Sequence, residues 1–281
     1  TTMVLIAVAA HHRRGTAVVW TCHNLAAHES DHPRLEALLR RRFERSVDGV
    51  IHLSEESRRL LADTGRLRGV PDDVVPHGRY RPPPTAPPDR VEARLSLGLA
   101  ADQPVMATVG RIRRYKNVPA LVRAFAELDR PAQLVVAGMP IDLATGDEVR
   151  RAAEGVAGLR LDDRWLTDDE LALRIAASDV VVLPYLEVHN SGVAILALGL
   201  GRPAVINPIG SLAGLAEAVG EEWVYPLTEP PSGQVLDDIL EWAAKPRSGR
   251  PNLDAFDPDV AARRTVEFYR RVIAAKEPAP A

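Results

Sequence analysis

The chain has 281 residues, of which 46% are apolar and 26% are charged, a composition that supports a packed core and excludes a globally disordered chain. Its 35 basic and 38 acidic residues give a net charge of −3, which excludes a nucleic-acid binder that depends on a general basic field. The single cysteine, Cys22, excludes an intramolecular disulfide and a cysteine-based metal cluster, and it fits a reducing cytoplasm.

The chain begins with an apolar run, residues 3–10, that is too short to span a bilayer. Arg13 and Arg14 follow this run, the reverse of the order in a signal peptide. No later segment is long enough to cross a membrane, so we expect a cytoplasmic protein. Peripheral membrane contact through the basic residues 40–45 stays open, although acidic residues in the same helix favour a solvated face.

Short apolar strands and amphipathic helices alternate along the chain, which is typical of a parallel α/β sheet. The expected strands are 17–22, 49–53, 73–76, 104–109, 133–137, 159–161, 180–183, 203–206 and 223–225. The expected helices are 33–46, 55–63, 118–128, 147–157, 168–177, 191–200 and 234–244, with a long last helix at 257–273. The fold class is therefore α/β, with doubly wound sheets.

A proline-rich stretch at residues 81–88 interrupts this pattern and indicates a linker between domains. Residues 1–80 would form an amino-terminal domain that is too small to be complete, and residues 89–250 a full doubly wound domain. Residues 251–281 would form a carboxyl-terminal helix that packs back on the first domain.

A basic loop follows the expected strand at 104–109. The strand ends at Gly110, and Arg111 and Lys116 come before the next helix. A glycine and cations between a strand and a helix are how an α/β domain builds an anion site, and two cations match a diphosphate. A solvated basic loop is the open alternative, because Arg113 and Arg114 lie in it too.

A second polar loop, after the expected strand at 180–183, carries Glu187, His189 and Asn190 and leads to Ser191-Gly192. Serine is a favoured N-cap, and glycine lets a ligand approach the first free amides of a helix, which attract phosphate. A capped helix without a ligand is the simpler interpretation. Since neighbouring parallel strands end at one edge of a sheet, we expect this loop to share a crevice with the basic loop.

Histidines follow two strands of the first domain. His23 comes at the end of one strand, where a neutral imidazole accepts a proton or bonds a hydroxyl, and His77 lies in a Pro-His-Gly turn. His28 is expected only to cap a helix. No third ligand for zinc is evident, so no metal site is predicted.

Together these segments resemble glycosyltransferases of the GT-B fold, in the group that includes glycogen synthase and bacterial mannosyltransferases. The resemblance covers roughly residues 17–225. The segments that carry it are Val109-Gly-Arg-Ile-Arg-Arg-Tyr-Lys116, Ala177-Ser-Asp-Val-Val-Val-Leu-Pro184, Leu198-Gly-Leu-Gly-Arg-Pro-Ala-Val205, Val75-Pro-His-Gly78 and Ser54-Glu-Glu-Ser57. It implies two Rossmann-like domains, of which the amino-terminal one lacks its glycine-rich acceptor loop.

The resemblance implies a hexosyltransferase that moves a sugar from a GDP- or UDP-sugar to a glycan, a lipid-linked or a small-molecule acceptor. Neither a metal nor a cofactor is implied, and the nucleotide sugar is the donor substrate. Catalytic roles fall on Arg111 and Lys116 at the diphosphate and on His23 at the reacting sugar. The donor site would comprise the basic loop and the segment from Glu187 to Gly192: Gly110, Arg111, Lys116, Glu187, Asn190, Ser191 and Gly192.

Two departures from the family pattern bear on this interpretation. The family carries two glutamates at positions that align with Val188 and Leu196 here; Glu187 stands beside the first, and nothing replaces the second. Asn190-Ser-Gly192 resembles the donor loop of a divergent subgroup. A nucleotide-sugar 2-epimerase on the same fold and a non-catalytic nucleotide-sugar-binding module therefore remain alternatives.

Overall fold

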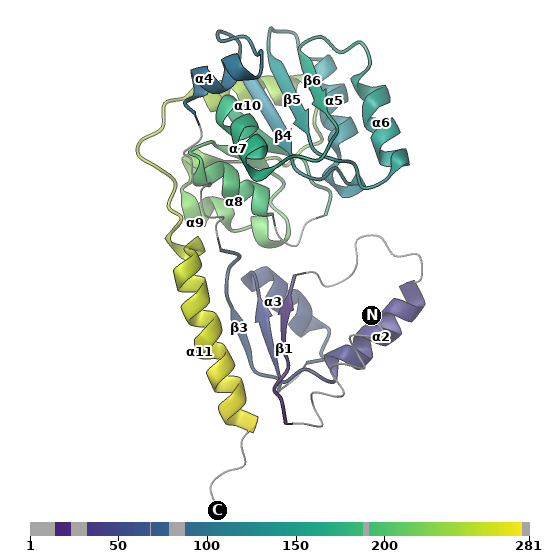
Figure 1. Cartoon of the computed structure of the whole chain (residues 1–281), viewed down its shortest axis with the longest axis vertical. Helices are drawn as coiled ribbons and strands as arrows, with labels where there is room; N and C mark the ends of the chain where they lie inside the picture. Colours follow the sequence, from purple (N-terminus) through teal and green to yellow (C-terminus); the bar gives the residue numbers. More distant parts are fainter. Residues whose placement is uncertain (1–14, 24–32, 68, 79–87, 188–190, 277–281) are drawn as a thin grey trace, which may run out of the picture. The chain divides into compact units, whose positions relative to one another are not determined.

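A computed structural model of the chain describes residues 15–23, 33–67, 69–78, 88–187 and 191–276 (Figure 1). The chain divides into two compact units. The first comprises residues 1–78 and 255–281, and the second comprises residues 79–254. Both units are α/β structures built on parallel sheets.

The first unit is a small parallel sheet with strand order β1-β2-β3. Its elements are β1 (Val19–Cys22), α2 (Pro33–Glu44), β2 (Gly49–His52), α3 (Glu55–Asp63), β3 (Asp72–Val74) and α11 (Pro258–Lys276). The Ser54 side chain caps α3 by accepting a hydrogen bond from the Ser57 amide. As in any parallel sheet, the carboxyl ends of the three strands lie at one edge.

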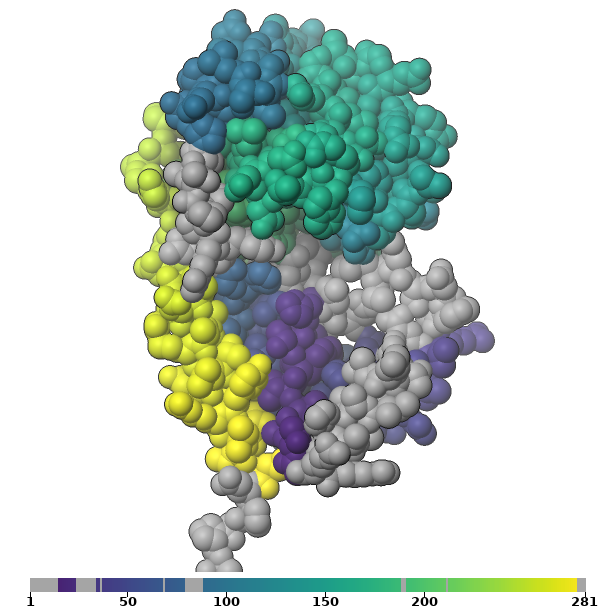
Figure 2. All heavy atoms as spheres, viewed as in Figure 1, coloured from purple at the N-terminus to yellow at the C-terminus, as the bar shows by residue number. Residues whose placement is uncertain are grey.

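The long helix α11 completes the core of the first unit. Phe268 and Val272 of this helix are buried and cluster with Ile51 and Val75. Figure 2 shows the yellow atoms of α11 against the purple atoms of β1, where Val19 packs on the same cluster. The last helix of the chain thus supplies apolar surface to a three-stranded sheet that would otherwise have one face uncovered.

The second unit is a six-stranded parallel sheet with strand order β6-β5-β4-β7-β8-β9. Its strands are β4 (Val105–Val109), β5 (Gln133–Ala137), β6 (Leu159–Asp162), β7 (Val180–Leu183), β8 (Ala204–Ile206) and β9 (Val224–Pro226). Its helices are α4 (Arg90–Ser96), α5 (Val118–Ala126), α6 (Leu143–Ala153), α7 (Asp168–Ala177), α8 (Gly192–Gly199), α9 (Leu215–Val219) and α10 (Gly233–Ala244). The strand order reverses between β4 and β7, which is where ligands bind in doubly wound folds.

Helices cover both faces of this second sheet. Residues of α5, α6 and α10 form one buried cluster with alternate strand residues such as Met106, Leu134 and Val182. The strand residues between them are also buried, on the face where α7 contacts β4 and β5. Because both faces are covered, β4 and β5 are buried along their whole length, as the apolar runs in the sequence predict.

The elements differ from the sequence prediction mainly at helix ends, which shift by two to four residues in α2, α5, α6 and α11, and at the start of α6. The helix expected at 147–157 begins four residues earlier, at Leu143, because the Asp142 carboxylate accepts a hydrogen bond from the Thr145 amide and caps the first turn. The short helices α4 and α9 have no counterpart in the prediction. They have seven and five residues, too few for a helical period to show in a sequence.

Candidate functional site

The basic loop leaves the sheet at the point where the strand order reverses. Gly110 follows β4 with a φ of +91°, a conformation that glycine adopts without strain. The next buried residue, Ile112, donates its amide to the Met139 carbonyl at 3.0 Å and accepts from the Ile141 amide at 2.8 Å. These two bonds hold the loop backbone against the segment after β5 and leave Arg111 exposed.

Gly138, at the end of β5, lies under this loop. It has a φ of +144°, and a Cβ built on it would overlap the Gly110 carbonyl. Any larger residue at position 138 would therefore push the loop away from the strand ends. The path of the basic loop depends on two glycines that are adjacent in space and 28 residues apart in sequence.

Lys116 is the buried cation of the loop. It ends a turn of 3₁₀ helix, Arg114–Lys116, and only 8% of its surface is exposed. Burial, with a smaller effect from Arg113, lowers its pKa from 10.5 to about 8. No carboxylate in the described part of the chain forms an ion pair with it. A buried ammonium without a counterion is a site that attracts an anion.

A pair of tyrosines joins the basic loop to the connection after β7. The rings of Tyr115 and Tyr185 meet edge to face at 5.7 Å, and the Leu186 amide donates to the Tyr115 carbonyl at 2.8 Å. The Lys116 Nζ lies 5.4 Å from the centre of the Tyr185 ring. The two loops that the sequence predicts to share a crevice are therefore in direct contact.

The sequence prediction gave Tyr185 no role. Its position just after an apolar strand was the only signal that could have identified it. It is buried, and burial raises the pKa of its hydroxyl, with a further contribution from Tyr115. This hydroxyl lies near Ser191 without forming a hydrogen bond of standard geometry. The Lys116 ammonium lies over the face of this ring.

The amino terminus of α8 lies beside Gly110. Ser191 is the N-cap, as the sequence predicts, and its Oγ accepts from the Ala194 amide at 3.3 Å. A Cβ built on Gly110 would lie 3.3 Å from Val193 in the first turn and 3.5 Å from the Lys116 Nζ. Gly110, Lys116 and the start of α8 thus surround one point, where a helix presents free amides and positive dipole potential.

The rest of the predicted donor loop is only partly described. Glu187 is exposed at its beginning. Val188, His189 and Asn190 lie outside the described residues, so the role of Asn190 stays a prediction. Leu196, which aligns with the second glutamate of the family, is half-buried in α8. This part of the helix therefore offers an apolar side chain where the family has a carboxylate.

The first unit brings two of the predicted histidines together. His23 is exposed directly after β1, and its ring centre lies 6.5 Å from that of His77, at an angle of 74°. The Nδ1 of His77 lies 2.9 Å from the Gly78 carbonyl. The sequence placed these histidines in separate motifs, and nothing in their spacing indicated that they meet at the carboxyl edge of one sheet.

His52 is a polar group of the first unit that the sequence prediction missed, because it lies within an apolar strand. It is buried, and its Nε2 lies 3.4 Å from the Asp72 carboxylate. Arg58 binds the same carboxylate through two hydrogen bonds of 2.9 Å. Burial lowers the pKa of His52 more than Asp72 raises it. This arrangement stabilises the end of β2 next to α3.

No three His, Cys, Asp or Glu side chains of the described residues cluster in a way that would hold a metal ion. The prediction that the reaction needs no metal stays a prediction. None of the helices within the described ranges has the length and apolar character needed to cross a membrane.

The chain is similar to a described protein family and to several known proteins. Residues 103–236 match the profile described as Glycosyl transferases group 1. The chain is 32% identical over 245 residues to a GDP-mannose:glycolipid 4-beta-D-mannosyltransferase of Xanthomonas campestris pv. campestris, covering 86% of this chain and 65% of that protein. It is 31% identical over 271 residues to a 2-deoxystreptamine glucosyltransferase of Streptomyces kanamyceticus, with the same coverages of 86% and 65%.

Solved structures agree on the fold. Anabaena Alr3699/HepE in complex with UDP and glucose superposes with a TM-score of 0.70 at 20% identity, over 98% of this chain and 76% of that one. A sucrose-phosphate synthase from Thermosynechococcus elongatus gives 0.70 at 22% identity, over 95% and 71%. The fold is therefore GT-B. The chain spans 65% of the length of the two curated relatives described above.

Proposed function

Residues 103–236 belong to the glycosyl transferases group 1 family, and from this premise we propose that the chain transfers a sugar from a nucleotide-diphosphate sugar to an acceptor. One observation carries the proposal. Lys116 is a buried ammonium with no carboxylate partner among the described residues, and it lies beside Gly110 and the amino terminus of α8, at the point where the strand order reverses. A bound diphosphate would supply the negative charge that compensates the Lys116 ammonium.

The chemistry follows from the charge that develops when the sugar leaves. The bond between the anomeric carbon and the diphosphate breaks, and negative charge accumulates on the leaving diphosphate. Lys116 stabilises this charge from its fixed position, and the exposed guanidinium of Arg111 grips a pair of phosphate oxygens. The free amides at Gly192 add the positive end of α8. With these groups in place, the reaction we propose proceeds without a metal ion or a cofactor.

We propose His23 as the group of the first unit that acts on the acceptor. Its imidazole takes the proton of the attacking hydroxyl, and neighbouring His77 helps to hold its orientation. Glu187, Asn190 and Ser191 are proposed to contact the sugar and phosphates of the donor. Because no carboxylate stands at Leu196, the ribose would be bound through backbone groups instead.

The relatives suggest which substrates to test first. The Xanthomonas protein carries GDP-mannose and glycolipid in its name, and the Anabaena protein was solved with UDP and glucose. We propose GDP-mannose as the first donor and a lipid-linked glycan as the first acceptor. A lipid-linked acceptor requires the enzyme to work at a membrane surface, so we also propose a cytoplasmic protein in peripheral contact with the membrane.

Thermal melts of the full chain with GDP-mannose, UDP-glucose and the free nucleotides test donor binding, since a ligand of the folded state raises its apparent stability. The variant Arg111→Ala/Lys116→Ala should lose the donor-dependent shift and all transfer while keeping its fold. Its matched control is Arg123→Ala/Arg151→Ala, which removes two exposed arginines of the same unit. Normal transfer by the first variant would disprove the diphosphate site.

Two further readouts separate the alternatives. Incubation of the donor without acceptor, followed by NMR of the sugar, detects an epimer if the chain is a 2-epimerase. Donor binding by calorimetry without turnover across an acceptor panel would identify a non-catalytic module. Transfer to an acceptor, lost in the Arg111→Ala/Lys116→Ala variant, is the result that we expect.

A further inference from the structure

A cavity lies at the amino edge of the six-stranded sheet. It has a volume of about 520 Å³ and is lined by residues that precede β4, β7 and β8, together with the ends of α4 and α10. Because the strands are parallel, this is the amino edge, opposite the edge where Gly110 and α8 meet. Six cations line it: Arg90, Arg94, Arg130, Arg202, Lys245 and Arg247. Its acidic lining residues are Asp102 and Asp179.

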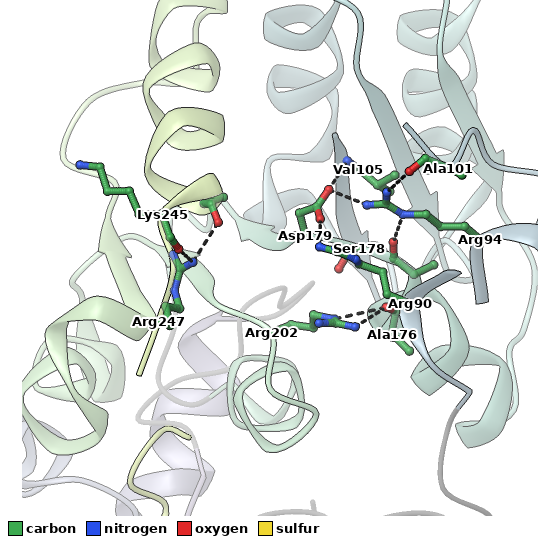
Figure 3. Close-up of polar contacts among 12 residues, drawn as sticks. Arg90, Arg94, Ala101, Val105, Ala176, Ser178, Asp179, Arg202, Lys245 and Arg247 are labelled. Atoms are coloured by element: carbon green, nitrogen blue, oxygen red, sulfur yellow. Dashed lines mark hydrogen bonds and ion pairs between the residues drawn. The ribbon is translucent and has the colours of Figure 1, made fainter. Parts of the chain in front are cut away.

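One carboxylate serves two of these arginines. Asp179 accepts hydrogen bonds from Arg90 at 2.7 Å, from Arg94 at 2.6 Å and from the Val105 amide at 2.8 Å. Figure 3 shows both guanidinium groups converging on it. Asp179 therefore compensates one positive charge of the pair and has its oxygens occupied. Arg94 is 5% exposed and is also held by two carbonyls, so it belongs to the framework of the cavity.

Arg202 is a half-buried cation on the same side of the cavity as Asp179 and Arg90. Its Nε and Nη2 donate to a single acceptor, the Ala176 carbonyl, at 3.2 and 2.8 Å (Figure 3). A carbonyl neutralises no charge. Burial and then the neighbouring Arg90 lower the pKa of Arg202 more than Asp179 raises it. The guanidinium thus lies in a net positive environment, with Nη1 left to donate.

The opposite wall is the end of α10. Arg247 donates to the Ala243 and Trp242 carbonyls of the last turn, and its Cζ lies 5.9 Å from the centre of the Trp223 ring. Lys245 is exposed, and Figure 3 shows it beside Arg247. Trp223 is 5% exposed, and its indole Nε1 is buried without an acceptor among the described residues. Each nitrogen of Arg247 already donates to a carbonyl, so this wall offers the positive charge of Arg247 and the unsatisfied indole donor of Trp223.

Among the described residues that line this cavity, cations outnumber carboxylates. Arg130 is paired outside the cavity wall with Asp237 at 2.9 Å, and Asp102 is exposed. With Arg130 set aside, five cations face two carboxylates, so three positive charges remain uncompensated among the described lining residues. A single carboxylate ligand would leave most of that excess in place. A phosphoryl group carries close to two negative charges and three acceptor oxygens, which match guanidinium forks.

We propose that this cavity binds a small molecule that bears a phosphoryl group. The phosphoryl oxygens accept from Arg90 and Arg202, which lie next to each other in Figure 3, and the organic part lies against Trp223 and Leu240. A volume of about 520 Å³ is within the range of small-molecule sites. The site is independent of the proposed donor site, because the two lie at opposite ends of the same strands.

The test uses inorganic pyrophosphate as the probe, with the full chain and calorimetry. Pyrophosphate should also bind the donor loop, so the starting protein is the Arg111→Ala/Lys116→Ala variant. We expect this variant to retain one pyrophosphate site. Adding Arg90→Gln/Arg202→Gln should weaken that site by about tenfold or more, the loss expected when charge-assisted contacts are removed. The matched substitution Arg123→Gln/Arg151→Gln removes the same charge elsewhere on the unit and should leave the affinity unchanged.

Tryptophan emission gives a second readout at the cavity itself. Pyrophosphate should change the emission of the chain by filling the space beside Trp223, and Trp223→Phe should abolish that change. Arg90→Gln alone, at a side chain that is 51% exposed, covers the case in which the double variant unfolds, and it should weaken binding several-fold. The proposal is overturned if the starting variant binds no pyrophosphate, or if the cavity and control substitutions have equal effects.

Discussion

Replacing Lys116 by methionine should stabilise the protein at pH 7 and abolish donor binding. Burial lowers the pKa of Lys116 from 10.5 to about 8, so the folded chain holds this charge at a free-energy cost. A shift of that size corresponds to about 3 kcal/mol. Methionine keeps the length of the side chain but loses the contact of the ammonium with the Tyr185 ring, worth about 1 kcal/mol. The net gain is about 2 kcal/mol, which raises Tm by roughly 5 °C for a chain of this size.

The pH dependence provides an internal check on the cause. Between pH 8 and pH 10.5 the unfolded chain keeps the proton of Lys116 while the folded chain has released it. Stability therefore rises with pH in this window. The methionine variant lacks this rise, so its advantage of about 2 kcal/mol should shrink as the pH increases and vanish before pH 10.5. Cys22, whose pKa burial raises to about 11, has the opposite effect, but it is common to both proteins.

The affinity for the donor should depend on the same ammonium group, but it should fall with increasing pH where the stability rises. A diphosphate binds the charged form of Lys116, so the affinity for GDP or UDP should be highest below pH 8 and fall as the free ammonium loses its proton. Thermal melts at pH 7 and pH 10, with and without nucleotide, measure all of these effects. A methionine variant that is less stable than the wild type at pH 7, or one whose advantage is the same at both pH values, would refute the reasoning.

Three substitutions test other parts of the second unit. Gly138→Ala should lower Tm and weaken nucleotide binding at the same time, because its Cβ would displace the Gly110 carbonyl; a variant with wild-type Tm and affinity would contradict that packing. Ser191→Ala should cost about 1 kcal/mol in urea unfolding and Ser191→Gly only a few tenths, as for other N-caps, and equal losses would argue against the cap. Asp179→Asn should cost about 3 kcal/mol in the same assay, since it leaves Arg94 buried without its carboxylate; a loss below 1 kcal/mol would show that the pair contributes little.

The elements that the sequence predicts best are those with local causes. The strands β4 and β5 are uninterrupted apolar runs, and β5 is found with the predicted bounds. Helix α7 also has the predicted bounds, because Thr167 and Glu170 form a capping box at its start. By contrast, the start of α6 was wrong because Thr145 and Gly146 are weak helix formers. Their place in the first turn depends on the Asp142 cap.

In the candidate site, too, the features with local causes were predictable and those that depend on long-range packing were not. The basic loop and the Ser191 cap are contiguous motifs, so their residue types and spacing indicated an anion site before any contact was known. The burial of Lys116 beside Tyr185 was not predictable, because it requires packing between two loops whose residues are 69 positions apart in the sequence. The proximity of His23 and His77 has the same origin. A sequence shows which charged and polar groups occur in a motif, whereas long-range packing determines which of these groups are buried.

The two edges of the second sheet show why one anion site carries a motif and the other does not. At the carboxyl edge, each strand runs directly into the loop that binds, so the ligand-binding groups of one loop are neighbours in sequence. At the amino edge, Arg90, Arg202 and Lys245 come from a helix start, a turn before β8 and the end of α10. No spacing rule links residues that are more than 100 and about 40 positions apart. These three residues line one cavity in which cations outnumber carboxylates. This imbalance arises only when the fold brings them together, so the sequence does not show it.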